Sequence, residues 1–144
     1  MTATDGELLV RIVDGIAHVT LNRPQARNAL TFGMYEELAK LCALAGTADD
    51  VDHIKAIVIT GAGDKAFAAG TDIGQFTAFD STEDGLRYEA KVEAVINQIE
   101  SCHVPVIAAL HGAVTGGGLV IAAAAHVRIA SAAAVAGMPI ARTL

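Results

Sequence analysis

The sequence has no tryptophan, few aromatic residues and only two cysteines. With aromatics at 4% of 144 residues, the core has to be built mainly from Ala, Val, Ile and Leu. The cysteines, Cys42 and Cys102, lie far apart in apolar helical patterns, and we expect them to be reduced thiols in the core. A net charge of -6 without a cluster of Lys and Arg excludes a nucleic-acid-binding surface. No metal site is predicted.

The ends of the chain lack features that many proteins carry there. The N-terminus has neither the basic nor the apolar region of a secretory signal, so a cytoplasmic location is the default expectation. The C-terminal segment, Met138–Leu144, contains a proline and no closing element or polar tail. We therefore expect one domain over residues 1–144 that is incomplete at its C-terminus.

Apolar runs alternate with helical patterns along the chain. Residues 7–13 and 16–21, separated by Asp14-Gly15, predict a β-hairpin. Helical spacing of apolar residues predicts a helix that starts near Thr31 or Asn28 and ends at Gly46, and another over 82–101. Short apolar strands are predicted at 56–60, 104–110 and 127–130. This order indicates an α/β architecture with a parallel sheet after the hairpin.

The stretch Val104–Ala125 contains no charged side chain except the ionisable His111. It predicts a buried strand, a glycine turn at 112–118 and an apolar helix over 119–125. Backbone N–H groups of Gly116–Gly118, at a helix start, can hold a developing negative charge. Alternatively, these glycines only permit close packing of the helix on the sheet. A membrane helix is a third interpretation, disfavoured by Pro105, His111 and the glycines.

A second glycine-containing loop, Ala68–Asp72, follows the predicted strand at 56–60. Before it, Gly61-x-Gly63-x-x-Ala66 matches the skeleton of a dinucleotide fingerprint, but no amphipathic helix opens there. Because ligands gather at the carboxyl ends of parallel strands, the two glycine loops can each contribute one N–H to a single oxygen. Such a pair would stabilise an enolate or a tetrahedral oxyanion.

Three motifs, in their order and spacing, resemble the crotonase (enoyl-CoA hydratase/isomerase) superfamily. They are Leu21-Asn22-Arg23-Pro24 with Asn28-Ala29-Leu30, Gly61-x-Gly63 with Ala66–Ile73, and His111-Gly112-x-x-x-Gly116-Gly117-Gly118. The resemblance runs from about Leu9 to the last residue and implies a crotonase-like α/β fold of repeated ββα units. It also implies lyase or isomerase activity in fatty acid metabolism and a homo-oligomer, a trimer or hexamer. The implied ligand is an acyl-CoA, so coenzyme A enters as part of the thioester substrate rather than as a bound cofactor.

The same resemblance assigns site residues. The oxyanion hole would use the backbone N–H groups of Thr71 and Gly117. The segment formed by Ala69, Gly70, Thr71, Asp72 and Ile73 would line the adenine and pantetheine of coenzyme A. Gln25 and Arg27 would lie near the nucleotide, with Arg27 paired to a phosphate. Ordinary solvated loop residues are the alternative for Gln25 and Arg27.

The departures from the family pattern concern the catalytic acids. Hydratases of the family have a glutamate two residues after the triple glycine, where this chain has Val120, and a second one where it has Ile140. Neither apolar side chain can move a proton, so we do not expect conventional hydration. His126 stands where many relatives have an aspartate. Substitute bases are less favoured than ordinary roles: a packed or surface histidine for His111, a backbone cap for Asp72, and a solvated helix face for Glu89 and Lys91.

Three functions remain open at this point. The chain is an acyl-CoA enzyme with a non-standard base, for isomerisation, decarboxylation or thioester hydrolysis. Alternatively, it is a catalytically silent homologue that binds CoA esters or assembles with an active subunit. The third possibility is a truncated product that is mainly an oligomeric or unstable fragment.

Overall fold

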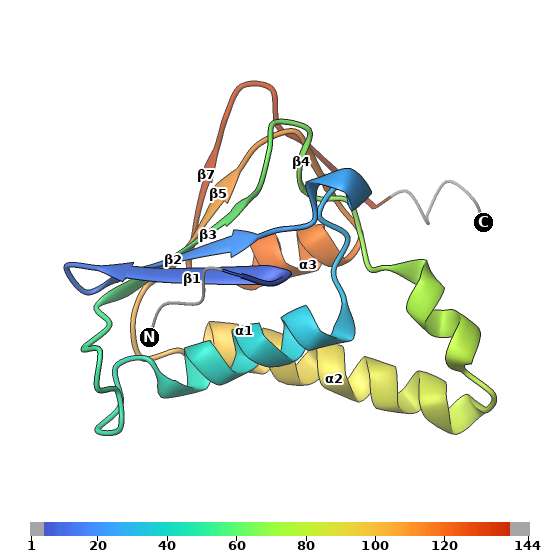
Figure 1. The fold of residues 1–144 in the computed structure, drawn as a ribbon, viewed down its shortest axis with the longest axis horizontal. Helices are drawn as coiled ribbons and strands as arrows, with labels where there is room; N and C mark the ends of the chain where they lie inside the picture. The colour runs from blue at the N-terminus through green and yellow to red at the C-terminus, as the bar shows by residue number, and fades with distance from the viewer. Residues whose placement is uncertain (1–4, 139–144) are drawn as a thin grey trace.

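The computed structural model describes residues 5–138, which form two parallel-rich sheets and three α-helices (Figure 1). The five-stranded sheet has the order β1-β2-β3-β5-β7, and the three-stranded sheet has the order β4-β6-β8. Helices α1 (Phe32–Leu44) and α2 (Thr82–Glu100) lie side by side on one side of the large sheet (Figure 1). The strands of the large sheet are β1 (Leu8–Val13), β2 (Ile16–Leu21), β3 (Ala56–Gly61), β5 (Val106–Leu110) and β7 (Val127–Ala130). The remaining elements are β4 (Ala66–Ala68), β6 (Ala113–Thr115), β8 (Val135–Gly137), α3 (Gly117–Ala124) and the short 3-10 helices η1 (Pro24–Ala26) and η2 (Ile73–Ala78).

The predicted hairpin and parallel sheet are confirmed. Strands β1 and β2 are antiparallel, and the turn residues Asp14 and Gly15 have φ of 52° and 81°. Two positive φ values in a two-residue loop give a turn whose twist matches the strands. Strand β3 lies between β2 and β5 and is parallel to both, and its Ile57 and Ile59 are fully buried.

The two long helices begin at the caps that the sequence offers. The Thr31 side chain accepts a hydrogen bond from the Met34 N–H at 3.3 Å, so Thr31 rather than Asn28 caps α1. Gly46 follows the end of α1 with a φ of 76°. In α2, Ser81 and Asp84 form a reciprocal capping box. The thiols of Cys42 and Cys102 are free and share a hydrogen bond, which together with burial raises the pKa of Cys42.

The glycine turn differs from its predicted form in two ways. It contains a strand, β6, which pairs with β4 and β8, and α3 starts at Gly117 rather than at Leu119. A three-residue strand is too short to show alternation, and Gly116, with a φ of 53°, allows the chain to enter the helix early. The stretch forms β5, β6 and the eight-residue α3 rather than one continuous helix. No helix within residues 5–138 is long and apolar enough to cross a membrane.

Candidate active site

The structure brings the two glycine-containing loops, Ala69–Asp72 after β4 and Gly116–Gly118 at the start of α3, into direct contact. A Cβ atom on Gly116 would lie 3.2 Å from Cα of Gly70. A Cβ atom on Gly117 would collide with the Tyr35 hydroxyl and lie 2.7 Å from Thr71 Oγ1. A Cβ atom on Gly118 would collide with the carbonyl group of Ala68. Close packing is therefore one reason for the glycines, because no side chain fits between the loops.

Each of the two loops also offers a backbone N–H group that has no acceptor within residues 5–138. Leu30 bridges the first loop by donating to the Gly70 carbonyl at 2.8 Å and accepting from the Asp72 N–H at 2.9 Å. This pattern leaves the Thr71 N–H without an acceptor among the described residues. The Gly117 N–H is at the first position of α3, where the first bond along the helix is from Val120 N–H to the Gly116 carbonyl, 3.1 Å. Two unpaired donors on touching loops can bind one oxygen.

Two tyrosines connect α1 and α2 to the first loop through the Thr71 side chain. The Tyr35 hydroxyl, from α1, lies 2.8 Å from Thr71 Oγ1, and the Tyr88 hydroxyl, from α2, lies 3.1 Å from the same atom. Tyr35 is 1% exposed, and burial raises its pKa to about 12, so its hydroxyl stays neutral. Sequence reasoning missed both tyrosines. The available signal was that the sequence has only these two, at spacings that place them on predicted helices.

An ion pair and a helix cap fix the end of the first loop at Asp72. Arg23 Nη2 contacts Asp72 Oδ2 at 2.7 Å, and Arg23 Nη1 donates to the Ala29 carbonyl at 2.7 Å. Asp72 Oδ1 accepts from the Gly74 N–H at 2.9 Å. The Gly74 N–H and the Arg23 guanidinium lower the pKa of Asp72. Asp72 is therefore a paired cap rather than a free base.

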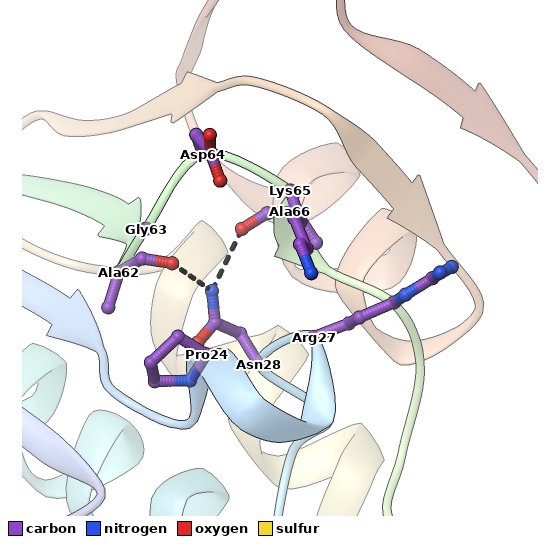
Figure 2. Close-up of a pocket in the computed structure, with 8 residues that line it drawn as sticks. All are labelled: Pro24, Arg27, Asn28, Ala62, Gly63, Asp64, Lys65 and Ala66. Carbon is purple, nitrogen blue, oxygen red and sulfur yellow. Dashed lines mark hydrogen bonds between the residues drawn. The ribbon is translucent and has the colours of Figure 1, made fainter.

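A buried amide organises the loop after β3. Asn28 is fully buried, and its Nδ2 donates to the carbonyls of Ala62 at 2.9 Å and Ala66 at 2.8 Å (Figure 2). Its Oδ1 accepts from the Arg23 N–H at 2.9 Å. Asn28 adopts a φ of 55°, a left-handed conformation that Asn tolerates better than most residues. One side chain thus connects the Arg23 turn to the loop at 62–66.

A cavity of about 190 Å³ opens beside Asn28 (Figure 2). Two cations, Arg27 and Lys65, line it together with the anion Asp64, and neither cation forms an ion pair within residues 5–138. Gln25 is exposed on η1 and does not line this cavity, and Ile73 is 80% exposed on η2. Lys65 was not among the predicted site residues. It differs from other lysines of the sequence only by its place in the Gly61-x-Gly63 loop.

A second cavity, of about 170 Å³, lies between the start of α1 and the first turns of α2. Tyr88 lines it, and its ring belongs to an aromatic cluster whose centroids are 4.8–6.4 Å apart. Lys91 also lines this cavity, pairs with Glu36 at 2.5 Å and lies 5.6 Å from the Phe32 ring centroid. Glu89 is exposed on α2. The full lining is Phe32, Phe79, Asp84, Arg87, Tyr88 and Lys91.

The two positions where the resemblance led us to expect catalytic acids, 120 and 140, are apolar in sequence. Val120 is half-buried in α3, and Ile140 lies outside the described residues. His126 accepts from the Val106 N–H at 3.0 Å through Nδ1, so Nε2 carries the proton and donates to the Glu100 carbonyl at 3.0 Å. The buried Nε2 atom of His111 has no hydrogen-bond partner in the described part of the chain.

The parallel sheet, the short second sheet and the glycine-started α3 define a crotonase-like α/β fold. A solved structure described as an enoyl-CoA hydratase/carnithine racemase from Magnetospirillum magneticum matches with a TM-score of 0.86 and 31% identity, over 99% of this chain and 52% of that one. The family model for enoyl-CoA hydratase/isomerase matches residues 11–143. The chain therefore belongs to the enoyl-CoA hydratase/isomerase family.

Two curated relatives show the extent of the likeness. A probable enoyl-CoA hydratase of Bacillus subtilis is 39% identical over 124 residues, which cover 86% of this chain and 46% of the relative. A short-chain-enoyl-CoA hydratase of Clostridium acetobutylicum is 36% identical over the same shares. The chain thus spans about half the length of the curated relatives it matches.

Proposed function

We propose that this chain binds an acyl-CoA thioester and polarises its carbonyl group with the backbone N–H groups of Thr71 and Gly117. The observation that carries the proposal is the pair of unpaired N–H donors on two touching loops. Such donors stabilise the negative charge that develops on a thioester oxygen when an enolate forms. The names of the relatives, enoyl-CoA hydratases, support a CoA thioester as the ligand.

In this proposal the nucleotide end of coenzyme A lies toward Arg27. Arg27 and Lys65 line one cavity without ion-pair partners among the described residues, so both can pair with phosphate oxygens. Ala69, Gly70, Asp72 and Ile73 connect this region to the Thr71 N–H and would line the rest of the coenzyme. Gln25, which is exposed and outside the cavity, would contact only the outer part of the nucleotide.

The role we propose is polarisation of the thioester carbonyl, which would stabilise an enolate oxygen, without the glutamate pair of the hydratases. Val120 and Ile140 occupy the positions of those acids, so syn-hydration of an enoyl-CoA is not expected. The half-buried Val120 favours a second candidate function, a silent homologue that binds CoA esters and assembles with other subunits. All four residues of β7 are exposed, which supports a homo-oligomer, a trimer or hexamer by resemblance.

A direct test compares ligands and then removes one donor. Titration calorimetry should show tighter binding of butyryl-CoA than of free butyrate, and equal affinities would contradict the proposal. Replacing the amide at Gly117 by an ester, through semisynthesis with glycolic acid, removes the N–H and adds no side chain. We expect this change to reduce the displacement of the thioester 13C carbonyl resonance in the bound ligand. An unchanged displacement would remove Gly117 from the site.

A further inference from the structure

A chain of three hydroxyl groups lies beside the two N–H donors. It runs from Tyr35 through Thr71 to Tyr88, with oxygen–oxygen distances of 2.8 and 3.1 Å. Thr71 carries one of the proposed donors, and its Oγ1 lies 2.7 Å from the Cβ position of Gly117, which carries the other. The proposed function uses only the backbone of these residues and leaves the hydroxyl groups without a role.

The Tyr35 hydroxyl has both other members of this chain of hydroxyl groups as partners. Its oxygen lies 2.8 Å from Thr71 Oγ1, and a side-chain hydrogen bond with Tyr88 contributes to its raised pKa. Tyr35 is 1% exposed, so burial keeps its hydroxyl paired with these two residues.

The less buried hydroxyl groups are those of Thr71 and Tyr88. Both residues are half-buried, whereas Tyr35 lies in the core. Burial raises the pKa of Tyr35 to about 12, so this hydroxyl keeps its proton at neutral pH. When Tyr35 donates a hydrogen bond to Thr71, the Thr71 hydroxyl becomes a stronger donor to a further acceptor.

We propose that the Tyr35–Thr71–Tyr88 chain supplies a third donor, an O–H group, to the thioester oxygen that the Thr71 and Gly117 N–H groups hold. This inference rests on the proposed function and adds side chains to a purely backbone site. An O–H donor adds to the polarisation of the carbonyl where no glutamate side chain is present at position 120. Tyr35 is a positioning residue, because it acts through Thr71.

The sequence allows a test that leaves the packing nearly unchanged. Tyr35 and Tyr88 are the only tyrosines of the protein. Biosynthetic replacement of tyrosine by a fluorinated tyrosine therefore modifies only these two hydroxyl groups. Fluorination makes the phenol a stronger hydrogen-bond donor. With butyryl-CoA carrying 13C at the thioester carbonyl, we expect the displacement of the bound carbonyl resonance to increase with the number of ring fluorines. A residue that only packs would not produce this dependence.

Substitutions provide a second test of the hydroxyl donor. Thr71→Val should reduce the carbonyl displacement and weaken butyryl-CoA binding by about 2- to 13-fold, the effect of one lost hydrogen bond. Tyr35→Phe should change both in the same direction by less, because Tyr35 acts through Thr71. Thr71→Ser, which keeps the hydroxyl, should restore both. Thr77→Val is the matched control, because the Thr77 hydroxyl donates to the Gly74 carbonyl at 2.7 Å in the neighbouring segment. This control should bind and polarise the ligand as the original chain does.

The outcomes separate the two proposals. If the original chain binds the ligand and displaces its carbonyl resonance, but fluorination and the substitutions leave that displacement unchanged, the hydroxyl donor is wrong and the backbone site remains. If the original chain neither binds nor polarises butyryl-CoA, both proposals are wrong. Fluorinated protein answers the question even where Thr71→Val or Tyr35→Phe fails to fold.

Discussion

The two ends of the proposed ligand site are built on different principles. At the carbonyl end, backbone groups and buried hydroxyls lie between packed elements, and Gly116–Gly118 leave no room for a side chain. At the phosphate end, Arg27 and Lys65 are exposed side chains around an open cavity. Changes at the carbonyl end should therefore alter the fold and the chemistry together. Changes at Arg27 and Lys65 should alter affinity alone.

The largest expected effect is at Gly118, where the carbonyl end is most closely packed. Gly118→Ala places a Cβ atom against the Ala68 carbonyl, so the free energy of unfolding should fall by about 3 kcal/mol, the upper part of the range for overpacking. Urea unfolding followed by circular dichroism measures this change. Gly85→Ala is the control, because its Cβ meets nothing within 4 Å in α2, and it should stabilise the chain by ~0.5–1 kcal/mol. A similar small gain at Gly118 would contradict the packing argument.

Asn28 is a buried residue of the phosphate end, and its replacement should reduce the stability of the fold. Asn28→Ala leaves the carbonyls of Ala62 and Ala66 without their buried donor and should cost about 2–3 kcal/mol of unfolding free energy. Asn28→Gly loses the same hydrogen bonds but tolerates the φ of 55°, so it should cost less than Ala. Thermal unfolding of the two variants gives the order. The reverse order would show that backbone strain does not contribute to the stability difference between these two variants.

The carbonyl end could be predicted from the sequence better than the phosphate end, because glycine spacing reflects backbone geometry. The triple glycine and the Ala69–Asp72 loop indicated two adjacent strand ends, and the structure brings them together. The Tyr35–Thr71–Tyr88 contacts were not predictable, because they join residues 17 to 36 positions apart, from α1, the loop after β4 and α2, and no sequence motif links them. Gln25 and Lys65 show the converse. Both are exposed polar residues, and only the fold shows that Lys65 lines the cavity.

The pH dependence of stability tests how fully Tyr35, at the carbonyl end, is buried from solvent. Its pKa is raised to about 12 mainly by burial, so the folded state keeps its proton when the unfolded chain loses it near pH 10. Stability from this residue should therefore be complete below about pH 10 and decline as the pH rises toward 12. Because the sequence has no tryptophan, the phenolate absorbance can be followed directly. The Tyr35→Phe variant should lose the part of the decline that belongs to this group, and an unchanged decline would assign it elsewhere.

The smallest expected effects are at the phosphate end. Arg27→Ala and Lys65→Ala should each weaken butyryl-CoA binding by about 0.5–1 kcal/mol, because both cations are exposed and screened by solvent. Neither variant should change the unfolding free energy or the carbonyl resonance of the bound ligand, in contrast to Gly118→Ala. Titration calorimetry at two salt concentrations measures the affinity, and added salt should reduce the difference between the variants and the original chain. Lys55→Ala, at a lysine outside the cavity, is the matched control and should bind as the original does. If Arg27→Ala instead alters the carbonyl resonance, the two ends are coupled and the division between them is wrong.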